Sequence, residues 1–185
     1  MASGRGESER RMNVRASRAF TLIELVAVFV LIWLLAVSAG PALSTVQRSR
    51  ESAAAREVSR LFVLARSEAM STSEPTGVRV DPSAGTFEML VVPNGTDPPA
   101  ILTSPLGEPR EALGLGIEFP GVVVEAVVLG DGSTGGGTIW FGHRATPQLR
   151  DGSGAYLGEF TTDASVKLTG TDPIYIRRGS GLVER

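Results

Sequence analysis

The sequence predicts an α+β protein in which one long N-terminal helix, membrane-spanning in its first half, packs on a C-terminal antiparallel β-sheet or sandwich. Three observations lead to this fold class. No ionisable side chain occurs from Leu25 to Gln47, and no glycine or proline occurs from residue 42 to residue 73. After Glu74-Pro75, short β-branched and aromatic runs alternate with turn residues.

The apolar run begins at Phe20 and carries one charge near its start, Glu24. At 1.5 Å per residue, residues 25–47 would form a helix of roughly 34 Å, enough to cross a hydrocarbon core of about 30 Å. A carboxylate in such a segment costs on the order of 2.5–3.5 kcal/mol at the bilayer centre, so Glu24 is a functional candidate. Residues 20–45 are therefore expected to form a transmembrane helix, to which the resemblance described below adds a role in assembly.

Residues 46–73 are expected to continue this helix as an amphipathic segment. Apolar side chains recur at spacings of three and four, which places them on one helix face. They are Ala54, Val58, Leu61, Phe62, Ala65 and Ala69. A kink is expected at Gly40-Pro41, because proline lacks the N–H that a helix interior needs.

Residues 74–185 are expected to form one periplasmic β domain. The predicted strands are Val78–Val80, Phe87–Val92, Ile101-Leu102, Leu115–Phe119, Val122–Leu129, Thr138–Phe141, Tyr156–Phe160, Ser165–Leu168 and Ile174–Arg177. Their short spacing, with turn residues between them, is typical of an antiparallel sheet or a two-sheet sandwich.

The stretch Ser17-Arg-Ala-Phe-Thr-Leu-Ile-Glu-Leu25 resembles the processing site of type IV prepilins and type II secretion pseudopilins. The resemblance implies that a prepilin peptidase cleaves between Ala19 and Phe20 and removes residues 1–19 as a basic leader. It also implies methylation of the new amine of Phe20, an assembly role for Glu24, and a helix proline at the position of Pro41. This sequence has Ala19 where the family usually has glycine.

The order and length of the elements are most similar to the GspH/FimT-type minor pilins, so the expected fold is pilin-like. This resemblance implies a minor pseudopilin that assembles into the periplasmic pseudopilus of a type II protein secretion system. The alternative is a FimT-like minor pilin of a type IV pilus involved in DNA uptake, in which Arg177 and Arg178 would contact DNA. The expected partners are other pilins or pseudopilins in a hetero-filament, the prepilin peptidase and the inner membrane.

The charge distribution predicts an orientation. The formal net charge is −2 overall, and five arginines with two glutamates give residues 1–19 a charge of +3, which leaves −5 for the remainder. Arginines beside a first spanning helix favour the cytoplasmic side, so we expect a single-pass inner-membrane protein with a cytoplasmic N-terminus and a periplasmic C-terminal domain. The negative charge of the remaining residues makes nucleic-acid binding an unfavoured function.

An ordinary secretory signal peptide, cleaved near Ser38-Ala-Gly40, is the alternative interpretation of the N-terminus.

Residues that could support catalysis or bind a metal are sparse. The chain has no cysteine, and His143 is its one histidine, so neither a thiolate zinc site nor a Cys–His pair is expected. The glycine-rich stretch Gly130–Gly137 lacks the Gly-Lys-Ser/Thr ending of a phosphate loop, and Asp131 is a single carboxylate for a Ca²⁺ site. The sequence therefore predicts no enzymatic activity, no cofactor and no metal.

Overall fold

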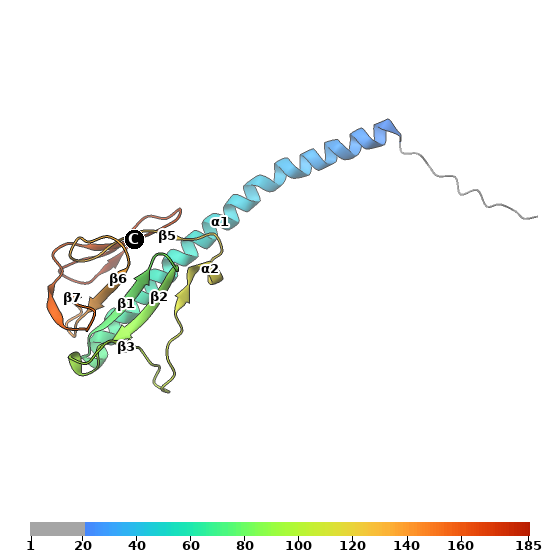
Figure 1. Cartoon of the computed structure of the whole chain (residues 1–185). Coiled ribbons are helices and arrows are strands. Elements are labelled where there is room, and N and C mark those ends of the chain that lie inside the picture. The colour runs from blue at the N-terminus through green and yellow to red at the C-terminus, as the bar shows by residue number, and fades with distance from the viewer. Residues whose placement is uncertain (1–20) are drawn as a thin grey trace, which may run out of the picture. The chain divides into compact units, whose positions relative to one another are not determined.

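The computed structural model describes residues 21–185, apart from the side chains of residues 37–43. The chain divides into two compact units, Met1–Ala42 and Leu43–Arg185. The helix α1 (Leu22–Thr72) contributes to both units, and all the strands follow it in the second unit (Figure 1).

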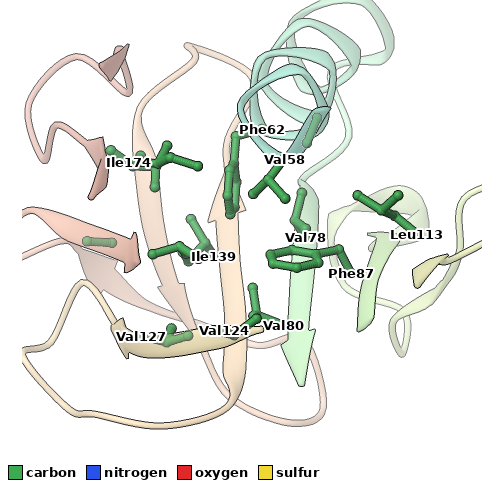
Figure 2. Packing of buried hydrophobic residues seen from close by; sticks show 14 of the residues in the cluster. Val58, Phe62, Val78, Val80, Phe87, Leu113, Val124, Val127, Ile139 and Ile174 are labelled. Atoms are coloured by element: carbon green, nitrogen blue, oxygen red, sulfur yellow. The ribbon is translucent and has the colours of Figure 1, made fainter. Parts of the chain in front are cut away.

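The core of the second unit is built on residues 54–69 of α1. Six side chains on one face of this segment have no exposed surface: Ala54, Ala55, Val58, Phe62, Ala65 and Ala69. Leu61, at the edge of the same face, is partly buried against the core. Figure 2 shows Val58 and Phe62 pointing toward strand residues such as Val78 and Ile139. The apolar spacing of three and four in the sequence is thus explained by burial in this core.

The larger sheet has seven antiparallel strands. They are β1 (Thr76–Asp81), β2 (Thr86–Val91), β3 (Ala100–Ile101), β4 (Leu113–Gly114), β6 (Gly137–Phe141), β7 (Pro147–Arg150) and β8 (Tyr156–Glu159). The order is β3-β2-β1-β6-β7-β8, and β4 also pairs with β2. In the central strand, Val78 and Val80 are buried while Arg79 and Asp81 are exposed, which is the alternation expected of a sheet with one face on the core.

The smaller sheet has four antiparallel strands in the order β11-β10-β9-β5. They are β5 (Val124–Val128), β9 (Ala164–Leu168), β10 (Ile174–Ile176) and β11 (Val183–Glu184). In β9 the side chains of Ala164, Val166 and Leu168 are buried. One hydrophobic cluster joins these residues to α1 and to the larger sheet, so the second unit has a core shared by both sheets.

Four short segments differ from the strand predictions: one predicted strand is absent, and β4, β7 and β11 were not predicted. The predicted strand Leu115–Phe119 is wrong, because α2 (Leu115–Glu118) is a single helical turn in which the Phe119 N–H donates to the Leu115 carbonyl at 2.7 Å. Leu115 is buried and Ile117 is 88% exposed. The strand β7 was not predicted, because it starts with Pro147, a residue that weakens a strand signal. A 3₁₀ turn, η1 (Pro93–Gly95), follows β2.

Three turns share one hydrogen-bonding pattern. Each has an aspartate followed two residues later by a serine: Asp81 with Ser83, Asp131 with Ser133, and Asp151 with Ser153. In every case the serine hydroxyl donates to Oδ1 at 2.6 Å, and the serine N–H donates to the same oxygen at 2.8–2.9 Å. These bonds stabilise the charged carboxylate and lower the pKa of all three aspartates.

The predicted fold class, a long helix with a membrane-spanning first half packed on the sheet, is wrong. Within the described residues no helix is long and apolar enough to cross a membrane. The part of α1 whose side chains enter the core is the short segment from Ala54 to Ala69, and the first half of α1 belongs to the other unit. The large antiparallel sheet content, and not a long apolar helix, characterises the described fold.

The predicted location is overturned by the same finding. A single-pass inner-membrane protein with its N-terminus in the cytoplasm and its C-terminal domain in the periplasm needs a spanning helix. The apolar part of α1 whose side chains are described comprises residues 21–36. At 1.5 Å per residue this part of the helix is about 24 Å long, which is shorter than a hydrocarbon core of about 30 Å.

Candidate functional site

The candidate site is the apolar segment, which we define as residues 21–36 of the first unit. Every side chain of this segment is exposed. The large apolar side chains range from 47% exposed at Val28 to 83% at Leu22. A continuous exposed apolar surface of this kind marks an interaction site.

The start of α1 is a capping box formed by Thr21 and Glu24. The Thr21 backbone N–H and the Thr21 hydroxyl donate to Glu24 Oε2 at 3.1 and 3.0 Å. In return, the Glu24 N–H donates to Thr21 Oγ1 at 3.3 Å. These bonds satisfy backbone N–H groups that have no partner at a helix N-terminus, and the carboxylate also favours the positive end of the helix dipole. The role of Thr21 was missed by the sequence analysis, although the spacing Thr-x-x-Glu in Thr21–Glu24 is the known signal for such a box.

Glu24 therefore has a structural role in addition to the predicted assembly role. Its Oε2 accepts both bonds from Thr21, and Oε1 accepts no hydrogen bond from the described residues. Glu24 is the one ionisable side chain of the apolar segment. The arrangement thus holds a single oriented carboxylate, with one oxygen available to a cation, at the head of an apolar surface.

The apolar segment also has a shallow groove formed by its own side chains. The residues that line it are Val26, Phe29, Val30, Ile32, Trp33 and Ala36. Phe29 and Trp33 lie four residues apart, hence on the same face of the helix, and are 63% and 66% exposed. Large aromatic side chains of this kind commonly supply most of the binding energy of a protein interface.

The residues of the predicted processing site, Ala19 and Phe20, lie outside the described residues. Gly40 and Pro41 lie within α1, but their side chains are outside the described part of the chain. Cleavage at Ala19-Phe20, methylation of Phe20 and a kink at Gly40-Pro41 stay predictions.

The two arginines considered for DNA contact, Arg177 and Arg178, are engaged within the second unit. Arg177 forms ion pairs with Asp163 at 2.8 Å and Glu184 at 2.7 Å. The guanidinium of Arg178 donates a hydrogen bond to the carbonyl of Thr161 at 2.9 Å. The backbone N–H of Arg178 donates to a carboxylate oxygen of Asp163 at 2.8 Å. These bonds lower the pKa of Asp163, first through the Arg178 N–H and then through Arg177. Both arginines thus have a structural function in joining β10 to the segment before β9.

The other residues that the sequence singled out have local roles. His143 is exposed in the turn between β6 and β7. Asp131 accepts bonds from Ser133 within its own turn, and residues 130–136 lie in the loop between β5 and β6. Over residues 21–185, no three or more histidine, aspartate or glutamate side chains are grouped to hold a metal ion.

In comparisons with protein-family models, curated proteins and solved structures, none matches this chain.

Proposed function

We propose that this protein is a minor pseudopilin, a subunit that assembles with related subunits into the pseudopilus of a type II protein secretion system. The observation that carries the proposal is the exposed apolar segment headed by the single carboxylate of Glu24. The processing-site resemblance at Ser17–Leu25 supports the same proposal.

Burial of the apolar segment among neighbouring subunits would supply the association energy. Removing apolar surface from water is favourable by about 25 cal/mol per Å², and each large side chain of the segment is at least 47% exposed. If each subunit offers one helix face to a different face of the next, the contact is heterologous. Repetition of such a contact with a rotation that does not close produces a helical filament.

Glu24 would set the register of that filament. Cleavage before Phe20 would create a protonated amine, and Glu24 Oε1 could pair with this amine in a neighbouring subunit. A misplaced subunit would leave one charge unpaired in an apolar environment, which typically costs about 3–5 kcal/mol. Charge pairing therefore favours one arrangement of the subunits.

The capping box allows the two roles of Glu24 to be tested separately. Glu24→Gln removes the charge but keeps a side chain that can complete the box, whereas Thr21→Ala breaks the box and keeps the charge. We expect Glu24→Gln to be lost from cross-linked assemblies by a hundredfold or more, because an amine would be buried without its partner. Thr21→Ala should be incorporated much better than Glu24→Gln. Normal assembly of Glu24→Gln, with a defect in Thr21→Ala alone, would show that Glu24 acts as a cap and nothing more.

Processing is tested by the intact mass of the purified protein. The proposal requires a chain that starts at Phe20, with or without one added methyl group. A mature chain that starts near Pro41 would support an ordinary signal peptide and contradict the proposal.

The DNA-uptake alternative has no support in the contacts of the described residues, because Arg177 and Arg178 are bonded within the second unit. Deletion of the gene, followed by parallel assays of protein secretion and DNA uptake, separates the two functions. We expect a secretion defect. An uptake defect alone would replace the pseudopilin with the DNA-uptake pilin.

A further inference from the structure

Three segments of the second unit meet at one corner, which we call the arginine corner. They are α1 at Arg66, the turn between β6 and β7 (residues 142–146), and the turn between β10 and β11 (residues 177–182). We infer that the arginine corner binds a carboxylate-bearing segment of a partner protein. This inference is independent of the apolar segment and of filament assembly.

Gly181 brings the three segments together. It is buried and has a φ of +64°, a conformation that favours glycine, and its N–H donates to the Arg177 carbonyl at 2.7 Å. A Cβ atom at Gly181 would clash with the carbonyl oxygen of Ala145 and would lie 3.4 Å from Arg66 Nε. The backbone of one turn thus lies directly against the other turn and against the Arg66 side chain.

Arg66 packs against Gly181 but has no hydrogen-bond or ion-pair partner among the described residues. Its Nε is buried and has no hydrogen-bond acceptor, and no ion pair of Arg66 is formed among the described residues. Buried donors without an acceptor are uncommon in folded proteins and cost about 1–3 kcal/mol when they occur. Arg66 as a whole is half-buried, and its Nε packs against Gly181. A side chain already fixed in this way loses little entropy when it binds.

A strained turn presents Arg144 at the same corner. Ala145 is 3% exposed and has a φ of +64°, a conformation that alanine adopts at a cost of roughly 1–2 kcal/mol. The turn is closed by bonds from the Gly142 N–H to Thr146 and from the Ala145 N–H to Gly142, both at 2.9 Å. This geometry leaves His143 and Arg144 exposed. Non-glycine residues in this region of φ/ψ space are enriched at functional sites.

The charge balance indicates the class of ligand. Arg177 is neutralised by Asp163 and Glu184, whereas neither Arg66 nor Arg144 has a carboxylate partner among the described residues. A guanidinium presents paired N–H groups that match a carboxylate or a phosphate. Residues 20–185 carry a net charge of −5, which repels a polyanion such as DNA over its length but affects a single carboxylate much less. A protein carboxylate is therefore the favoured ligand.

The experiment measures binding of a short, fluorescently labelled peptide with one glutamate among uncharged residues to the full chain, in mild detergent at low ionic strength. The wild type is compared with Arg144→Gln, with Arg66→Gln/Arg144→Gln, and with Arg56→Gln as a control. Arg56 is an exposed arginine of α1 without an ion pair among the described residues. We expect the double variant to bind about tenfold more weakly or worse, Arg144→Gln to show part of this loss, and Arg56→Gln to match the wild type.

Two results would overturn the inference. One is equal binding of the peptide by the wild type and Arg144→Gln, a variant at an exposed position that does not disturb the core. The other is tighter binding of a labelled DNA duplex that is lost in the same variants, which would make the ligand a phosphate backbone. Thermal unfolding of every variant separates loss of binding from loss of folding.

Discussion

Two stretches of α1 differ in both apolar content and surroundings, and the more apolar stretch is the exposed one. From Thr21 to Ala36 all side chains are exposed, and Phe29 is 63% exposed. From Ala54 to Ala69 one face is completely buried, and Phe62 has no exposed surface. The second stretch is buried against two sheets of its own unit, whereas the first stretch belongs to the other unit and is exposed there.

This comparison shows that apolar composition alone does not determine whether a helix stabilises its own subunit. Residues 54–69 alternate apolar with polar positions, so one face is buried and the other is solvated. Residues 25–36 are apolar on all sides, which suits a helix that is covered from several directions. We therefore expect substitutions in the two stretches to affect different measurements.

The largest effect is expected from Phe62→Ala. Removing a fully buried phenylalanine leaves a cavity in the core and should lower the free energy of unfolding of the second unit by about 3–5 kcal/mol. Denaturant unfolding followed by near-UV circular dichroism measures this change. The matched control is Phe29→Ala, for which we expect a change within about 0.5 kcal/mol. A large loss in Phe29→Ala would mean that the apolar segment stabilises the folded subunit.

A smaller loss is expected from Gly77→Ala in the centre of the larger sheet. A Cβ at this position would lie 2.6 Å from the Trp140 ring and 2.9 Å from the carbonyl oxygen of Ile139. The resulting overpacking should cost about 1–3 kcal/mol in the same unfolding assay. Gly116→Ala is the control, because no atom lies within 4 Å of its Cβ position. Equal stability of the two variants would show that the sheet adapts without cost.

Removal of the capping box at the start of α1 tests whether the first unit is stabilised independently of the second. Thr21→Ala should destabilise the start of α1 by about 0.5–2 kcal/mol, which is measured as reduced amide protection in hydrogen exchange over the first turns. Unfolding of the second unit should not change, because Thr21 belongs to the first unit. A fall in the stability of both units would contradict the separation described here.

The smallest effect is expected from the three Asp-x-Ser turns. The pKa values of Asp81, Asp131 and Asp151 are lowered in the folded state, chiefly by the serine hydroxyl bonds. Their stabilising contribution is therefore present above the ordinary aspartate value of about 3.9 and is lost as the pH falls through the lower folded pKa values. A variant with all three serines replaced by alanine should lose less stability between pH 6 and pH 3 than the wild type, measured by urea unfolding. An identical pH dependence would contradict this role.

The local pattern of the sequence determined several features directly. The spacing of Val58, Phe62 and Ala65 correctly predicted a buried helix face, because helical geometry puts such residues on one side. Most strands of the sheets were located by β-branched runs between turns. The capping box at Thr21–Glu24 could also be read from the sequence, since it depends on residues three apart.

Tertiary structure alone decided the rest, because those features depend on residues far apart in the chain. The division of α1 between two units contradicted the predicted packing of one long membrane-spanning helix, since hydropathy does not report which partners a helix finds. The single turn at Leu115–Glu118 and the strand at Pro147–Arg150 are determined by neighbouring strands and not by local propensity. The arginine corner required three segments to converge, and the roles of Arg177 and Arg178 depended on Asp163 and Glu184, which no local pattern in the sequence connects to them.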